Sequence, residues 1–178
     1  MGEMGEGDRN LGFLEKAIRL IPGYKGYKNK EERRDNDQLL RAMLVQRLER
    51  VRTGLNEVIN SLKGPAALAA AGDMDRLVKR LEQVTDEVRF AERGYRGWFD
   101  IHKVREEELD SLYQFDAGLA EDVALLETAL KSLGEAARSG EPFTAHTGGM
   151  LDILFKFSAK MASRSNLMID LERNQPID

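Results

Sequence analysis

The sequence has no cysteine, no long apolar run and no basic leader. Without cysteine the chain forms neither disulfides nor thiolate-bound metal sites, which is typical of proteins from reducing compartments. Its apolar runs fall well short of the roughly 20 residues that a membrane-spanning helix needs. The acidic residues 1–8 do not follow the basic-then-apolar order of a signal peptide. We therefore expect a cytoplasmic protein.

Proline is also scarce, with 4 residues in a chain of 178, whereas helix-forming residues are abundant. No segment shows the period-two alternation that marks a strand. Hydrophobic residues make up 42% and charged residues 33%, which fits one globular domain with a charged exterior. We predict an all-α protein with a single domain over 10–173, a disordered tail at 1–9 and a frayed tail at 174–178.

Apolar residues recur at spacings of three and four along five segments, the pattern of a buried helix face. The predicted helices cover about 10–20, 28–63, 73–94, 105–134 and 150–173. The second carries the longest seam, formed by Leu40, Leu44, Leu48, Val51, Leu55, Val58 and Leu62. We expect Asp73 to cap the third helix, residues 143–149 to form a loop, and Phe155 to lie on the buried side of the fifth.

Short connections between helices favour antiparallel neighbours. We therefore predict an elongated up-down four-helix bundle, coiled-coil-like in its seams. The first predicted helix is too short to be stable alone and is added to the bundle as a short amphipathic N-terminal helix.

A short motif occurs twice, as Gly23-Tyr24-Lys25-Gly26-Tyr27 and as Gly94-Tyr95-Arg96-Gly97-Trp98. Each copy reads Gly-Tyr-basic-Gly-aromatic. The first copy precedes the second predicted helix and the second copy follows the third, so an up-down arrangement places both at the same end. The glycines suit loops that need positive φ or close backbone approach.

That shared end gathers aromatic and basic side chains, a combination enriched at recognition surfaces. We interpret it as a candidate partner-binding site. Its predicted members are Tyr24, Lys25, Tyr27, Lys28, Arg33, Arg34, Tyr95, Arg96, Trp98, Phe99 and Lys103. In the alternative interpretation, the aromatic residues only plug the open end of the bundle, and the basic residues pair with helix C-termini and with acids of the fourth helix.

Charge is segregated along the chain, although the net charge is only −4. Residues 16–34 contain seven basic and two acidic side chains, and residues 106–127 contain eight acidic and no basic ones. Within the acidic segment, Asp116 and Phe115 compete for one seam position. We favour Phe115 in the seam and Asp116 on the flank. The alternative is a buried Asp116, which requires a partner such as an arginine from the basic end.

No catalytic or cofactor signature is present, so we expect a protein that is not an enzyme and uses no cofactor or metal. Carboxylate-bridged metal sites in bundles use Glu-x-x-His pairs, but neither His102 nor His146 follows a glutamate by three. The chain has no Gly-x-Ser-x-Gly, and the repeated motif lacks the Gly-Lys-Ser/Thr ending of a phosphate loop. The negative net charge makes a nucleic-acid partner unlikely.

Two stretches of the sequence resemble sequences found in other proteins. They are Ile21-Pro22-Gly23-Tyr24-Lys25-Gly26-Tyr27-Lys28, followed by Glu31-Glu32-Arg33-Arg34, and Gly94-Tyr95-Arg96-Gly97-Trp98-Phe99-Asp100, followed by Leu112-Tyr113-Gln114-Phe115-Asp116. These stretches resemble a family of small uncharacterised prokaryotic helical proteins. The resemblance covers the first through fourth predicted helices and implies no assigned activity.

We therefore predict a non-enzymatic helical interaction or scaffold module that binds a protein partner, or itself, through the aromatic-basic end. The alternative is a peripheral membrane-surface adaptor. In that case the amphipathic segment 11–21 and the basic flank 16–34 would approach an anionic membrane.

Overall fold

The computed structural model describes residues 6–174, and side chains from residue 12 onwards. These residues form five α-helices and two short 3-10 helices, and no strand is present among them. The elements are α1 (Glu6–Leu20), α2 (Lys30–Ser61), α3 (Gly64–Phe90), η1 (Ala91–Gly94), η2 (Arg96–Asp100), α4 (Glu106–Ser139) and α5 (Thr144–Arg173). The all-α prediction is confirmed. Across residues 6–174, no helix has an apolar stretch of the length that a bilayer crossing requires.

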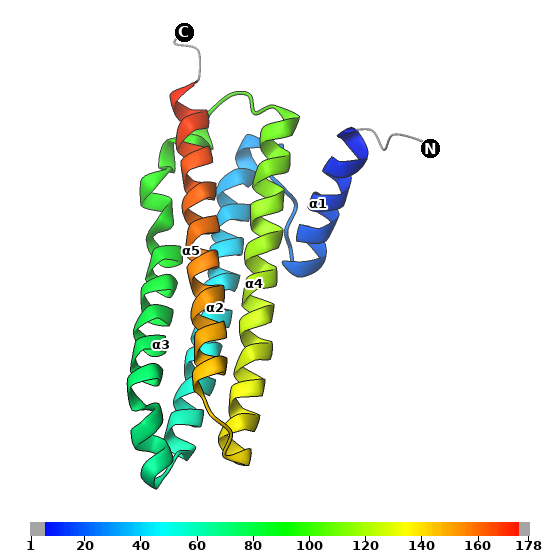
Figure 1. Ribbon diagram of the computed structural model, residues 1–178. Helices are drawn as coiled ribbons and strands as arrows, with labels where there is room; N and C mark the ends of the chain where they lie inside the picture. The colour runs from blue at the N-terminus through cyan, green and yellow to red at the C-terminus, as the bar shows by residue number, and fades with distance from the viewer. Residues whose placement is uncertain (1–5, 175–178) are drawn as a thin grey trace.

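The four long helices lie side by side, and α1 packs outside them against α4 (Figure 1). The extensive pairs among the long helices are α2 with α3, α3 with α5, α5 with α4, and α4 with α2. The helices α3 and α4 therefore stand at opposite corners. The connection between them contains η1 and η2 and crosses one end of the bundle. Neighbours in the chain are neighbours in space for α2/α3 and α4/α5, but not for α3/α4.

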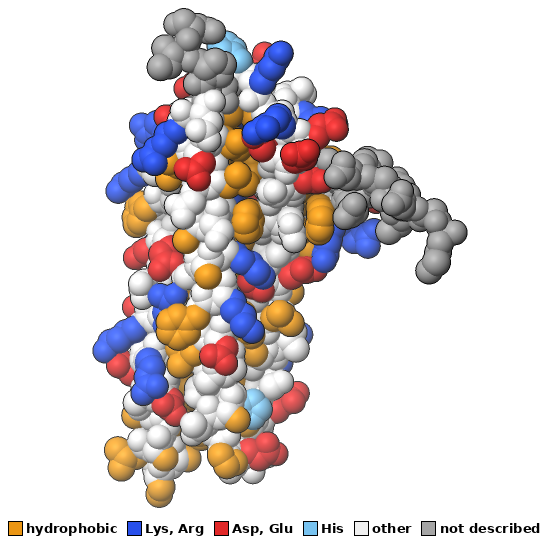
Figure 2. Space-filling model, turned by 45° about the horizontal axis from the view of Figure 1, so that its top comes forward, with side chains coloured by type: hydrophobic (Ala, Val, Ile, Leu, Met, Phe, Trp, Pro, Cys, Tyr) orange, Lys and Arg blue, Asp and Glu red, His pale blue; other side chains and the backbone are white. Residues whose placement is uncertain are grey.

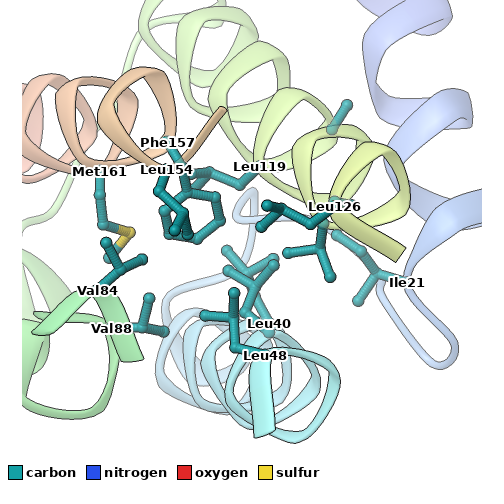
Figure 3. Packing of buried hydrophobic residues seen from close by; sticks show 14 of the residues in the cluster. Ile21, Leu40, Leu48, Val84, Val88, Leu119, Leu126, Leu154, Phe157 and Met161 are labelled. Atoms are coloured by element: carbon teal, nitrogen blue, oxygen red, sulfur yellow. The ribbon is translucent and has the colours of Figure 1, made fainter. Parts of the chain in front are cut away.

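The core is a continuous apolar seam to which all four long helices contribute (Figure 3). In α2, Val58 and Leu62 of the predicted seam are partly buried, whereas the buried apolar positions are Leu40, Leu44, Leu48, Val51 and Leu55, all predicted from the spacing. They meet Val84 and Val88 of α3, Leu119 and Leu126 of α4, and Leu154, Phe157 and Met161 of α5. Burying each such side chain stabilises the fold by about 1.5–3 kcal/mol, so this seam supplies most of the cohesion.

The helices α1 and α3 begin earlier than predicted. The helix α3 begins at Gly64, not at Asp73, since Pro65 suits the first helical turn and the alanines after it favour helix. The helix α1 begins at Glu6, so residues 6–9 are helical rather than a tail. The predicted tails at 1–5 and 175–178 lie outside the described residues.

The connection between α4 and α5 is also shorter than predicted. The helix α4 continues through Gly134 to Ser139 and ends at Gly140, whose φ of 75° closes it in the left-handed conformation. The helix α5 then begins at Thr144, inside the segment predicted as a loop.

The buried face of α5 differs from the predicted one. Phe155 is 57% exposed and lies under the guanidinium of Arg80 at 4.6 Å. The buried positions are instead Met150, Leu154, Phe157, Met161, Arg164, Met168 and Leu171. The stripe was misplaced because one of its central positions is an arginine, which apolar spacing alone does not count.

Candidate functional site

Both copies of the repeated motif lie at the same end of the bundle, as predicted. The first copy lies in the connection from α1 to α2, and the second copy runs from the last residue of η1 through Tyr95 into η2. The ring of Tyr27 packs edge-on against Trp98, with 5.2 Å between centroids. Arg33 Nη1 also donates to the main-chain oxygen of Ile101 at 2.8 Å. The two motif loops, defined here as residues 21–29 and 94–101, are therefore in direct contact.

The aromatic members of the candidate site are buried. They are Tyr24, Tyr27, Tyr95, Trp98 and Phe99, each at most 3% exposed. Edge-on contacts link Tyr24 to Tyr27 and Trp98 to Phe99. These rings close the end of the bundle, as the alternative interpretation held, and present no face to a partner.

The basic members divide into one buried and five exposed residues. Arg33 is 2% exposed. The exposed members are Lys25, Lys28, Arg34, Arg96 and Lys103. Figure 2 shows Lys and Arg side chains interspersed with Asp and Glu over this end. The outer surface of the motif loops is therefore charged rather than aromatic, and whether it binds a partner stays a prediction.

In the first loop glycine is required by conformation, whereas in the second Gly97 lies against the end of the exposed Glu172 side chain. Gly23 and Gly26 have φ of 83° and 95°. A Cβ on Gly26 would also lie 2.8 Å from the Tyr113 hydroxyl. In the second loop, a Cβ on Gly97 would overlap the carboxylate of Glu172.

Replacing Gly26 with alanine is therefore expected to destabilise the protein by about 2 kcal/mol, since backbone strain of this kind costs about 1–3 kcal/mol. Urea unfolding followed by circular dichroism measures the change. The matched control is Gly148→Ala in α5, where no atom lies within 4 Å of the added methyl and about 0.5–1 kcal/mol of stabilisation is expected. Equal stability changes in the two variants would contradict the prediction.

A buried ion cluster lies beneath the two motif loops. Its centre is Arg164 of α5, which reaches Asp116 of α4 and Asp37 of α2. Arg164 Nε lies 2.6 Å from Asp116 Oδ1, and Arg164 Nη2 lies 2.9 Å from Asp37 Oδ1. All three side chains are fully buried. One cation thus links three of the four long helices.

Every N–H group of the Arg164 guanidinium has a hydrogen-bond acceptor, as a buried cation requires. Nη1 donates to the Tyr95 hydroxyl at 3.3 Å and to Met168 Sδ at 3.6 Å. Nη2 donates to the Tyr27 hydroxyl at 2.8 Å as well as to Asp37. The orientation of the side chain is consequently fixed.

Three tyrosine hydroxyls complete the bonds to the two carboxylates. Tyr24 and Tyr27 donate to Asp116 Oδ2 at 2.6 and 2.5 Å. Tyr95 donates to Asp37 Oδ1 at 2.9 Å. The first two tyrosines belong to the first motif loop and the third belongs to the second. Both loops are therefore anchored to the charged centre of the bundle by their motif tyrosines.

A second arginine balances the remaining negative charge. Arg41 Nε lies 2.8 Å from Asp37 Oδ2, and Arg41 Nη2 lies 2.9 Å from Glu92 Oε2 in η1. The inner cluster of Arg41, Arg164, Asp37 and Asp116 is electrically neutral. Neutrality and complete hydrogen bonding are the two conditions under which buried charges are tolerated.

Burial and pairing fix the protonation of the cluster. Burial opposes the charged form of Arg164, but Asp116 and Tyr27 outweigh it, so the pKa of the guanidinium rises well above its ordinary value. Burial also raises the pKa of Tyr24 and Tyr27 well above 10, and the charge of Asp116 adds to this shift. The arginine is therefore charged and the tyrosines are neutral at physiological pH.

The preferred placement of Asp116 on the helix flank was wrong. Asp116 is fully buried, whereas Phe115 is partly exposed. The alternative of a buried Asp116 was right, but its partner comes from α5 rather than from the basic end. A signal for that partner exists in the sequence, because Arg164 occupies a seam position between Met161 and Met168.

The ion cluster is closed to solvent and therefore offers no surface to a substrate. Within residues 6–174, no group of three or more histidine, aspartate and glutamate side chains is arranged to hold a metal ion. An apolar hollow of about 300 Å³ lies between α2 and α3 at the opposite end of the bundle, and Asp75 is its one titratable lining residue. The hollow therefore has no convergent set of titratable groups, and the titratable groups of the ion cluster are all paired with one another.

The apolar face of α1 is occupied by α4. Ala17 is fully buried, as is Ile21 just beyond the helix, and Leu14 is partly buried against the core. Lys16 Nζ pairs with Glu121 Oε1 of α4 at 2.5 Å. The membrane-adaptor alternative needs this face, so it would require α1 to leave α4.

Comparisons of the chain with protein-family models, with curated proteins and with solved structures find no match.

Proposed function

We propose that the protein is a non-enzymatic helical interaction module that binds a protein partner, or a second copy of itself, through the outer surface of the two motif loops. The observation that carries the proposal is the anchoring of both loops to one buried ion cluster while their basic side chains remain exposed. Pre-organised loops lose little conformational entropy on binding. A scaffold of this kind presents charges in fixed positions.

The charges on this surface favour an acidic partner. Among the described residues, Lys28, Arg34 and Arg96 take part in no ion pair, and Lys25 reaches Glu32 only at 4.0 Å. Arg34 lies over the ring of Phe99 at 5.2 Å, which holds its exposed guanidinium in place. Exposed cations in such positions steer and orient a negatively charged partner.

We also propose that α2–α5 form an up-down four-helix bundle with a diagonal crossover between α3 and α4. The four extensive helix pairs and the course of the chain in Figure 1 support this topology. The crossover places η1 and η2 over the bundle end, beside the α1–α2 connection. A cytoplasmic location, which the lack of cysteine favours, stays part of the proposal.

Reversing two of the exposed charges, in Lys25→Glu/Arg96→Glu, is expected to abolish partner capture while leaving the fold intact. Both side chains are exposed, so helicity and thermal midpoint should change little. The measurement is affinity capture from native lysate by wild type and variant, with every retained protein identified. Sedimentation velocity of the purified proteins detects binding to a second copy.

The matched control is Lys63→Glu/Arg76→Glu, which changes the net charge by the same amount away from the motif loops, with Lys63 at the opposite end of the bundle and Arg76 midway along α3. It should capture the same partner as wild type. If both double variants lose the partner equally, the effect is one of overall charge and the proposed surface is wrong. If neither loses it, the partner binds elsewhere.

A further inference from the structure

Arg33 is a buried cation without a carboxylate partner. Its side chain lies between the motif loops and is 2% exposed. Nε donates to the main-chain oxygen of Tyr27 at 3.1 Å, and Nη1 donates to that of Ile101 at 2.8 Å. Across the described residues, its guanidinium forms no ion pair with a carboxylate, and Nη2 bonds to no protein acceptor and is not fully enclosed.

The contrast with the other fully buried arginine is informative. Arg164 has two carboxylates and a complete set of acceptors. Arg33 has only two neutral carbonyl groups and the face of Trp98, whose ring centroid is 5.4 Å away. Burial accordingly lowers the pKa of Arg33. A buried charge in this state is stabilised by any anion that reaches it.

A second donor without an acceptor lies beside the first. Trp98 is fully buried, and its indole Nε1 has no hydrogen-bond partner in the described part of the chain. Buried indole N–H groups normally find an acceptor. Because the guanidinium of Arg33 lies over this ring, two adjacent side chains have N–H groups without acceptors.

The surroundings add positive potential. Arg33 is in the first turn of α2, where the helix dipole is positive. Lys28, next to the residue whose carbonyl binds Arg33, is exposed and forms no ion pair among the described residues. Glu31 and Glu32 share this turn, but neither forms an ion pair with Arg33.

We propose that the junction of the two motif loops is a binding site for an oxyanion, that is, a phosphate or carboxylate group. The oxyanion accepts hydrogen bonds from Arg33 Nη2 and Trp98 Nε1, and Lys28 contributes a second positive charge. This site goes beyond the protein-partner proposal and does not depend on it. The oxyanion is either a free ion or a group carried by a peptide.

Trp98 is the one tryptophan in the chain, so its fluorescence reports directly on the site. Inorganic phosphate is titrated into the full-length protein at constant ionic strength, with sodium chloride as the reference salt. The expected result is a saturable change in Trp98 emission, with a matching heat in isothermal titration calorimetry. An emission change that is absent, or equally large with chloride, would overturn the proposal.

Two exposed lysines supply a matched pair of variants. Lys28→Ala should weaken phosphate binding about threefold, the size expected for one exposed charge. Lys63→Ala, at the other end of the bundle, should bind as wild type does. Equal affinities for these two variants would overturn the site. Arg33→Gln should abolish the fluorescence change. If that variant does not fold, the comparison of Lys28→Ala with Lys63→Ala still tests the site.

A further arm identifies the source of the oxyanion. A short phosphoserine peptide and the same peptide with glutamate in place of phosphoserine are titrated alongside free phosphate. Tighter binding of either peptide than of free phosphate assigns the site to a protein ligand. Binding of free phosphate with equal or higher affinity assigns it to the free ion. Both results presuppose the specific response to phosphate described above and assign its source, and absence of that response overturns the site.

Discussion

Replacing Arg164 with methionine is expected to destabilise the protein by about 3–5 kcal/mol, the range for breaking a buried ion pair by removing one partner. The variant leaves Asp116 without its cation and leaves Asp37 with Arg41 alone. The methionine fills similar volume, so the loss reports charge rather than a cavity. The measurement is the urea midpoint, followed by far-ultraviolet circular dichroism at neutral pH.

The matched control is Lys160→Met, one turn earlier on the same helix. Lys160 pairs with Asp122 of α4 at 2.8 Å, but its side chain is 37% exposed. The carboxylate of Asp122 is only 9% exposed, but its cation reaches solvent, so removing Lys160 should cost less than removing Arg164. If the two variants lose equal stability, burial does not make the Arg164 cluster special and the interpretation fails.

The double variant Arg164→Met/Asp116→Leu measures the interaction between the two side chains apart from the interactions that each makes with other residues. It removes both charges of the closest contact and leaves Asp37 paired with Arg41. We expect it to be less destabilised than the sum of the two single variants, because an isolated buried charge is worse than none. Additive losses would show that the two side chains act independently.

Stability is expected to fall steeply above about pH 10, because all four tyrosines of the chain are buried. Burial raises the pKa of Tyr24, Tyr27, Tyr95 and Tyr113. Below the ordinary pKa of about 10, folded and unfolded chains hold these protons equally. Above it, the unfolded chain releases protons that the folded chain retains, so the free energy of unfolding decreases by up to about 5 kcal/mol per pH unit.

Absorbance at 295 nm measures tyrosinate, and circular dichroism measures helix content. The two alkaline transitions should coincide in the folded protein, whereas the urea-unfolded chain should form tyrosinate near pH 10 without any further transition. Tyrosinate that forms near pH 10 while helicity is unchanged would contradict the burial of these hydroxyl groups.

Much of the fold can be predicted from the spacing of apolar residues, because a regular spacing of three and four places them all on one buried face of a helix. The seam of α2 from Leu40 to Leu55 is of this kind, and it is buried as predicted. The meeting of the two motif loops also followed from chain topology. It required only that α2 runs away from its own start and that α3 returns.

The ion cluster was not predictable in the same way. When a polar residue occupies a position of the apolar seam, the spacing pattern places the buried face of the helix elsewhere. For this reason Asp116 was assigned to the flank of its helix and Phe155 to the core. Arg164 lies far from its carboxylates in the sequence, so no local pattern pairs them. Arg33 and Arg34 are adjacent in sequence, yet only the first is buried, because successive helix residues point in different directions and only Arg33 reaches between the two loops.

The position of Arg164 in the last helix has a consequence for the order in which the protein is made. On the ribosome, α2 and α4 emerge with Asp37 and Asp116 before α5 does. A nascent chain that closed early would enclose Asp116 without its cation, which is unfavourable. We therefore expect α2 and α4 to pack fully only once α5 has left the exit tunnel and supplied Arg164.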